Sequence, residues 1–141
     1  MATLAARLAS AKRIADGRRI VATDIEARLG TRFTADTLRK LRIRFPNAHL
    51  TWLMGADNLV QLPRWKHWKR IVKLIPFAVL PRPTYNHRAL AGRAARRLRP
   101  VRLSARHAAI LSGLTAPRWI FLPSRQHAAS ASQIRLAAQF P

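Results

Sequence analysis

The sequence predicts an α/β fold in which a parallel β-sheet is flanked by helices. Short apolar runs typical of strands alternate along the chain with segments of helical periodicity, an order that favours parallel β-α-β units. The run at 77–80 has no polar alternation, as is typical of a strand buried on both faces of a parallel sheet. With 141 residues, 49% of them apolar, the chain is long enough for one domain with a buried core.

The N-terminal segment is expected to hold a helix and then a strand. Apolar residues spaced by three and four positions predict an amphipathic helix over 1–15, which Gly17 ends. The segment 19–25 predicts a strand centred on Ile20 and Val21. The Arg-rich first helix also resembles an organelle transit peptide, and the pattern alone leaves both interpretations open.

A second helix and a second strand follow. The helix begins near Thr34, whose hydroxyl can cap it, with Asp36 favourable in its first turn. Pro46 ends this helix. The strand covers 49–54 and stops at Gly55.

A third helix is expected from Pro63, because proline suits a first helical turn. Trp65, Trp68 and Val72 would lie on one side of this helix, and Pro76 would end it.

The C-terminal half continues the alternation. After the strand at 77–80, the pattern predicts a basic helix over 86–99, a strand over 119–122 and a last helix from Ser130 through Ala138. The segment 100–117 gives no clear pattern and is the expected flexible region.

The charge balance is extreme, with 27 Lys and Arg against 5 Asp and Glu, for a net charge of +22. No acidic residue follows Asp57. Such a chain attracts polyanions such as nucleic acids, nucleotide phosphates or acidic lipids. The absence of cysteine excludes disulfides and Cys-ligated metals. No apolar run approaches the length of a membrane span.

Gly55 and Asp57 follow the expected strand at 49–54 and could meet a nucleotide. Glycine lets a ligand approach the backbone, and a carboxylate at the end of a strand can accept hydrogen bonds from ribose hydroxyls. The same residues could form an ordinary turn in which Asp57 caps the next helix.

Trp65 and Lys66 could bind a flat anionic ligand, since indole stacks on aromatic rings and lysine attracts anions. The alternative is that both tryptophans are core residues; this interpretation is favoured for Trp68 and stays open for Trp65.

Ser130, Ser132 and Arg135 could form a phosphate cradle at the start of the last helix. A plain serine cap explains the two hydroxyls as well. The Arg-rich segment 88–106 could bind nucleic acid, but it lacks interleaved aromatic residues, which favours a solvated helix face. The histidines show no metal-ligand spacing.

Several short motifs follow one another along nearly the whole chain. They are Ile25-Glu26, Phe33-Thr34-x-x-Thr37-Leu38, Phe45-Pro46, Met54-Gly55-Ala56-Asp57-Asn58-Leu59, Trp65-x-x-Trp68-x-x-Ile71, Ala78-Val79-Leu80 with Arg82-Pro83, and Ser130-Ala131-Ser132-x-Ile134-Arg135. In this order the chain resembles bacterial nicotinate-nucleotide adenylyltransferases. Phe33 stands where that family usually has tyrosine, and Ser132 where it usually has threonine.

The resemblance implies a Rossmann-like nucleotidylyltransferase of the cytoplasm. Such an enzyme transfers AMP from ATP to nicotinate mononucleotide, giving deamido-NAD and pyrophosphate in NAD biosynthesis, with Mg²⁺ expected beside ATP. Its partners would be these two nucleotides, with no membrane and no nucleic acid. The resemblance assigns the nicotinate nucleotide to Thr34, Trp65 and Lys66. It assigns ATP to Gly55, Asp57, Arg82, Ser130, Ser132 and Arg135.

The front of the family pattern has no counterpart in this sequence. The family opens with a Gly-Gly-x-Phe loop and a His/Thr-x-Gly-His motif, whose histidines stabilise the ATP phosphates. We therefore expect a single domain over 1–141 that lacks the first two strands of the family fold, and we assign no catalytic residue. Those two strands would lie between the strands at 19–25 and 49–54, so unpaired edges and apolar faces are expected there. An inactive truncated remnant and a basic nucleic-acid-binding module are the alternatives.

Overall fold

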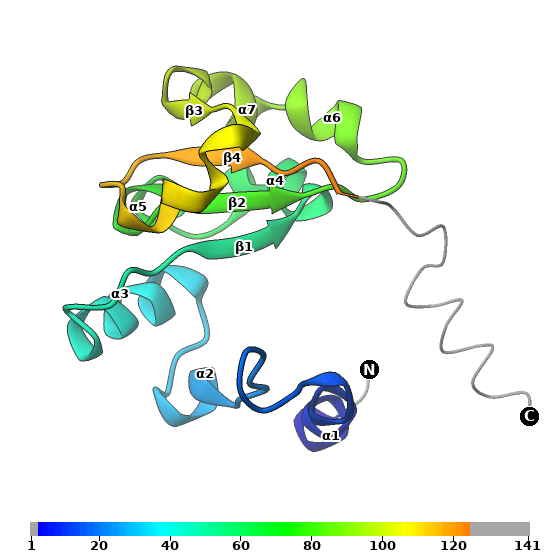
Figure 1. The fold of residues 1–141 in the computed structure, drawn as a ribbon, viewed down its shortest axis with the longest axis vertical. Coiled ribbons are helices and arrows are strands. Elements are labelled where there is room, and N and C mark those ends of the chain that lie inside the picture. Colours follow the sequence, from blue (N-terminus) through cyan, green and yellow to red (C-terminus); the bar gives the residue numbers. More distant parts are fainter. Residues whose placement is uncertain (1–2, 125–141) are drawn as a thin grey trace, which may run out of the picture.

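The computed structural model describes residues 3–124, and in this part of the chain the fold is α/β (Figure 1). Four strands form one sheet in the order β1-β2-β4-β3, and every neighbouring pair is parallel. Their bounds are β1 (Trp52–Gly55), β2 (Phe77–Leu80), β3 (Arg102–Leu103) and β4 (Trp119–Phe121). The predicted parallel sheet is thus confirmed, and the carboxyl ends of all four strands meet at one edge.

Helices make up most of the rest of the described chain. The α-helices are α1 (Leu4–Ile14), α2 (Ile25–Arg28), α3 (Thr34–Arg44), α4 (Ala56–Gln61), α5 (Trp68–Leu74), α6 (Asn86–Leu90) and α7 (Arg93–Arg97). Of these, α4 to α7 lie beside the sheet (Figure 1). The 3₁₀ helices are η1 (Leu62–Arg64), η2 (Arg99–Val101) and η3 (Ala105–Gly113). None of the described helices is both long and apolar enough to cross a membrane.

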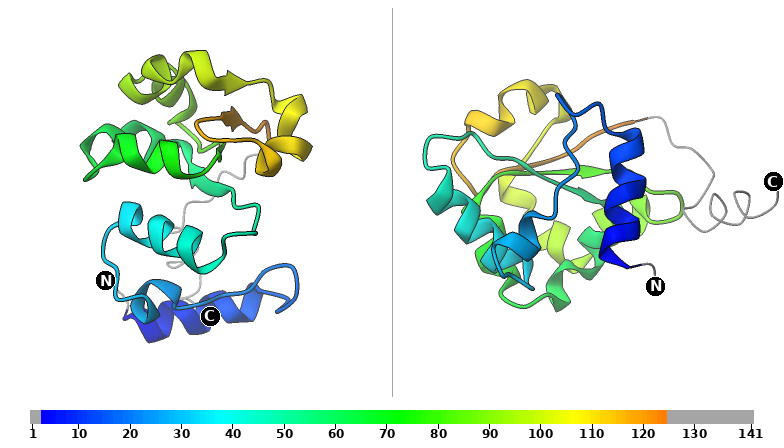
Figure 2. Two further views of the ribbon diagram at one scale, coloured as in Figure 1. Left: turned by 90° about the vertical axis from the view of Figure 1, so that its left-hand side faces the viewer. Right: turned by 90° about the horizontal axis from the view of Figure 1, so that it is seen from below.

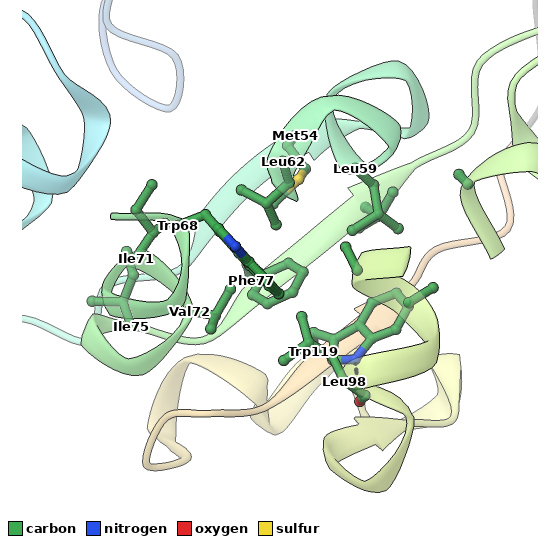
Figure 3. Packing of buried hydrophobic residues seen from close by; sticks show 14 of the residues in the cluster. Met54, Leu59, Leu62, Trp68, Ile71, Val72, Ile75, Phe77, Leu98 and Trp119 are labelled. Carbon is green, nitrogen blue, oxygen red and sulfur yellow. Dashed lines mark hydrogen bonds between the residues drawn. The ribbon is translucent and has the colours of Figure 1, made fainter. Parts of the chain in front are cut away.

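The core lies mainly on one face of the sheet (Figure 3). Phe77 and Val79 of β2 point into a large cluster formed with α4, α5 and α7, whereas Ala78 between them packs against Leu111 of η3 on the other face. This alternation explains why β2 is an uninterrupted apolar run, because both of its faces are covered.

Trp119 anchors the core from β4. Its ring stacks on Phe77 with 5.6 Å between ring centroids and 8° between planes. Its indole Nε1 donates a 2.8 Å hydrogen bond to the buried carbonyl of Leu98. The one polar atom of this side chain is therefore satisfied inside the core, as burial requires.

The expected strand at 19–25 is wrong. The Asp16 carboxylate accepts hydrogen bonds from the amides of Arg18, Arg19 and Ile20, at 2.9, 2.8 and 2.8 Å. These bonds curl the backbone into a turn, and Ile20 and Val21 are 63% and 64% exposed. α1 forms as expected but buries no residue. Figures 1 and 2 show α1 and α2 on the β1 side of the sheet, beyond α3.

The expected helix from Pro63 is also wrong in its bounds. α4 starts directly after β1, Pro63 lies in η1, and α5 begins only at Trp68. The expected basic helix over 86–99 is two helices, because Gly92 is the extended N-cap of α7. The unassigned segment 100–117 holds η2, β3 and η3.

The remaining element predictions differ in detail. α3 begins at Thr34 as expected, but its N-cap is Phe33 and no side chain caps it. The strand expected over 49–54 covers Trp52–Gly55. β1 is paired only with β2 among the described strands, and its Leu53 is 60% exposed. The helix expected from Ser130 lies outside the described residues.

Candidate functional site

A cavity of about 350 Å³ lies between the start of α3 and the segment that joins η1 to α5. It is lined by Arg32, Phe33, Thr34, Arg64, Trp65, Lys66 and Ile71. Thr34, Trp65 and Lys66, which the family resemblance assigned to one ligand, therefore line one cavity although they come from two separate segments.

Two aromatic rings border this cavity. Trp65 is half-buried and packs against Trp52 of β1, with 5.8 Å between ring centroids and a tilt of 49°. Phe33 is 39% exposed, and Lys66 Nζ lies 4.6 Å from the centre of its ring. Trp52, which does not line the cavity, thus packs against Trp65, while the phenyl ring and the ammonium group form a cation–π pair at the edge of the cavity.

The lining carries only one sign of charge. Arg32, Arg64 and Lys66 are cations, and no carboxylate is among the lining residues. The cavity also borders the N-terminal turn of α3, where the helix dipole is positive and backbone amides lack helical acceptors. A flat ligand that carries negative groups suits this combination.

A second group of predicted residues meets at the carboxyl ends of β1 and β2. Arg82 Nε lies 3.5 Å from Asp57 Oδ1, an ion pair too long for a hydrogen bond. Asp57 lies in the first turn of α4. The backbone amide of Arg82 donates a 2.7 Å hydrogen bond to Asn86 Oδ1, which holds the loop after β2.

Gly55 allows Asp57 and Arg82 to come close to each other. A Cβ atom at this position would collide with the Asp57 carboxylate and lie 2.9 Å from Arg82 Nε. Gly55 is also the N-cap of α4, and no side chain makes a capping bond there. The alternative in which Asp57 caps the helix is therefore wrong, although its charge favours the helix N-terminus.

The other predicted residues divide into two kinds. Trp68 is 8% exposed within the core, as the core interpretation expected. Ser130, Ser132 and Arg135 lie outside the described residues. Among the residues that are described, no group of three His, Asp or Glu side chains could hold a metal ion.

Sequence reasoning missed Arg32 and Arg64 as parts of the cavity. Each directly precedes an aromatic residue of the site, Phe33 and Trp65. Their places next to Phe33 and Trp65 in the sequence could have indicated that they lie at the same site.

Comparison with known proteins places the chain in a family. The sequence model of the cytidylyltransferase-like family matches residues 1–137. A relative from Gluconacetobacter diazotrophicus is 56% identical over 98% of this chain and 64% of its own length. One from Gluconobacter oxydans is 51% identical over 99% of this chain and 72% of its own length. One from Parvibaculum lavamentivorans is 51% identical over 96% of this chain and 67% of its own length.

All three relatives are named probable nicotinate-nucleotide adenylyltransferase. The chain spans 64% to 72% of their length. The family match covers nearly the whole chain, and the motifs noted in the sequence lie within it. The chain therefore belongs to the cytidylyltransferase-like family, and its relatives there are proteins named as nicotinate-nucleotide adenylyltransferases.

Proposed function

We propose that the protein acts in adenylyl transfer from ATP to nicotinate mononucleotide, giving deamido-NAD and pyrophosphate in the cytoplasm. The cavity between residues 32–34 and 64–66 carries this proposal. Nicotinate mononucleotide has a flat pyridine ring, a carboxylate and a phosphate, and the cavity offers aromatic rings and cations with no carboxylate. The names of the relatives support the same substrate.

In this proposal the nicotinate nucleotide occupies the aromatic cavity. The Trp65 indole stacks on the pyridine ring. The backbone at Thr34, at the positive end of α3, and the backbone amide of Lys66 meet the carboxylate. The side chains of Arg32 and Arg64 add positive potential that favours an acid over an amide at this position.

ATP is assigned to the carboxyl ends of β1 and β2. Gly55 leaves the backbone open to the nucleoside, Asp57 accepts from ribose hydroxyls, and Arg82 meets phosphate. Ser130, Ser132 and Arg135 complete the phosphate-binding set. Mg²⁺ would enter with ATP, because phosphate oxygens and water supply most of its ligands in such sites.

The chemical step needs the two nucleotides held in line. A phosphate oxygen of nicotinate mononucleotide attacks the α-phosphorus of ATP, and the bond to the β-phosphate breaks so that pyrophosphate leaves. Residues of this chain contribute positioning and positive charge around the phosphates, which are the main protein contributions to phosphoryl-type transfer.

Titration calorimetry with nicotinate mononucleotide tests the proposal, with nicotinamide mononucleotide as the matched control. The acid should bind more tightly than the amide, and substitution Lys66→Gln together with Arg64→Gln should reduce that preference. Pyrophosphate release with ATP and Mg²⁺ then measures transfer. Absence of binding at millimolar nicotinate mononucleotide would contradict the proposal.

A further inference from the structure

Among the residues that the structure describes, Thr37 is the one polar residue that is buried as a whole, with 5% of its surface exposed. It lies in α3, one turn after Thr34, and does not line the cavity. Thr37 belongs to the motif Phe33-Thr34-x-x-Thr37-Leu38, but the proposed function assigns it to neither nucleotide. A buried hydroxyl needs hydrogen-bond partners, so its partners indicate what it holds in place.

Three groups surround the Thr37 hydroxyl. Its Oγ1 lies 2.8 Å from Thr31 Oγ1, 3.3 Å from the Phe33 carbonyl oxygen and 3.4 Å from Glu26 Oε1. A hydroxyl has one proton to donate and can accept from others. Either hydroxyl can be the donor in the bond between Thr31 and Thr37. When Thr31 donates, the Thr37 proton is free for the Phe33 carbonyl or the Glu26 carboxylate; when Thr37 donates, the Thr31 proton can go to the Glu26 carbonyl, 3.4 Å away. One atom thus connects α2, the following loop and the start of α3.

Two further bonds hold the same loop, one to each neighbouring helix. Lys40 Nζ of α3 donates a 2.5 Å hydrogen bond to the Leu29 carbonyl, and the Thr31 amide donates a 2.9 Å bond to the Glu26 carbonyl of α2. Gly30, at φ +60°, lets the chain turn between them. The loop is therefore attached to α3 by the side chains of Thr37 and Lys40, one and about two turns into the helix.

The attached loop leads directly into the cavity wall. Arg32, Phe33 and Thr34 follow Thr31 without a break and line the cavity. The Phe33 carbonyl accepts from the amides of Asp36 and Thr37, at 3.0 and 3.1 Å, and lies within reach of the Thr37 hydroxyl, at 3.3 Å. The Thr37 hydroxyl thus acts on the residue whose ring forms the cavity rim.

We propose that Thr37 is a positioning residue for the nicotinate-nucleotide cavity. Its hydroxyl fixes the loop 29–33 against α3 and so sets the Phe33 ring and the first-turn backbone of α3 in the geometry that receives the ligand. This role rests on the proposed function. It goes beyond that function by assigning the preformed shape of the cavity to a buried hydroxyl that touches no substrate.

The variants Thr37→Val and Thr37→Ser test this role. Valine keeps the shape and removes the hydroxyl, whereas serine keeps the hydroxyl. Thr51→Val is the matched control, because Thr51 Oγ1 is buried with no hydrogen-bond partner in the structure. Amide hydrogen exchange over 29–36 and over 54–59 reports loop order without any ligand. Calorimetry gives the dissociation constants for nicotinate mononucleotide and for ATP.

We expect Thr37→Val to speed exchange over 29–36 but not over 54–59. It should weaken nicotinate-mononucleotide binding about five-fold or more, which is about 1 kcal/mol, the size of one hydrogen bond. The affinity of Thr37→Val for ATP should stay unchanged. Thr37→Ser should bind nicotinate mononucleotide as the unaltered chain does, and Thr51→Val should change neither the exchange over 29–36 nor the affinity for nicotinate mononucleotide.

Unchanged exchange over 29–36 in Thr37→Val would overturn the inference, as would an equal loss of affinity for both nucleotides. If the unaltered chain fails to bind nicotinate mononucleotide, the proposed function fails. The exchange measurement still decides in that case whether Thr37 orders the loop.

Discussion

Trp65 and Trp68 are three residues apart and have different surroundings. The spacing suggested one helical face for both, and only the family resemblance assigned Trp65 rather than Trp68 to a ligand. In the structure, η1 ends before Trp65, whose backbone is extended at φ −76° and ψ 143°, and α5 begins at Trp68. The break directs Trp65 to the cavity and Trp68 to the core.

This difference predicts opposite consequences of truncation. Trp68→Ala should lower the free energy of unfolding by about 3–5 kcal/mol, the usual cost of removing a buried aromatic side chain. Trp65→Ala should cost clearly less stability but abolish measurable nicotinate-mononucleotide binding. Urea denaturation and calorimetry on both variants check this. Retention of ligand affinity in Trp65→Ala would refute the stacking role.

Asp16 gives a prediction on pH. Hydrogen bonds from the backbone amides of Ile20, Arg18 and Arg19 lower the pKa of the Asp16 carboxyl from its ordinary 3.8. Because the folded pKa is depressed, the turn at 16–20 is fully held above pH 3.8 and opens as pH falls through the lowered value. NMR shifts of the Arg18 and Ile20 amides should therefore titrate with a midpoint below 3.8. In Asp16→Ala these amide shifts should show no such titration, and a midpoint above 3.8 in the unaltered chain would contradict the prediction.

At the scale of elements, the junction of β1 and α4 leaves no room for a side chain at Gly55. Gly55→Ala places a methyl group against the Asp57 carboxylate and Arg82 Nε. The substitution should cost about 1–3 kcal/mol of stability, as overpacking does, and weaken ATP binding about ten-fold or more. Gly113→Ala is the matched control, because a Cβ there meets nothing within 4 Å. Equal effects of the two substitutions would contradict this account.

The sequence predicted the elements whose character is set by burial. β2 and β4 are apolar runs with covered faces, and α3 has a clear period between Thr34 and Pro46. It failed where a single local contact decides the backbone. The apolar, β-branched pair at 20–21 suggested a strand, but the Asp16 side chain captures the amides that a strand would have used.

The candidate site was partly predictable for a similar reason. Thr34, Trp65 and Lys66 belong to recognisable motifs and line one cavity in the structure. Arg32 and Arg64 were not predicted as site residues, because the chain has 27 Lys and Arg and little besides their aromatic neighbours distinguishes these two from the others. The role of Thr37 depends on contacts with Glu26 and Thr31, which only the fold of the loop brings within reach.

At the scale of the whole molecule, charge is the dominant feature. The chain carries a net charge of +22, whereas the described residues form only two ion pairs, Arg28 with Asp24 and Arg82 with Asp57. In the described part of the chain, most cations therefore have no carboxylate beside them. Such self-repulsion opposes the compact state, and salt weakens it by screening.

Salt should consequently stabilise this fold. Between about 10 and 150 mM NaCl the screening length falls from about 30 to about 8 Å, so Tm should rise by about 3 °C or more, which corresponds to about 1 kcal/mol in a domain of this size. Choline chloride at equal ionic strength should act equally, because screening does not depend on the cation. An additional rise on adding a small amount of phosphate or sulfate, too little to act by exclusion from the surface, would instead indicate anions bound at sites such as the cavity lined by Arg32, Arg64 and Lys66. A Tm that stays constant or falls with NaCl would contradict this prediction. It would show that repulsion between the cations does not measurably destabilise the fold.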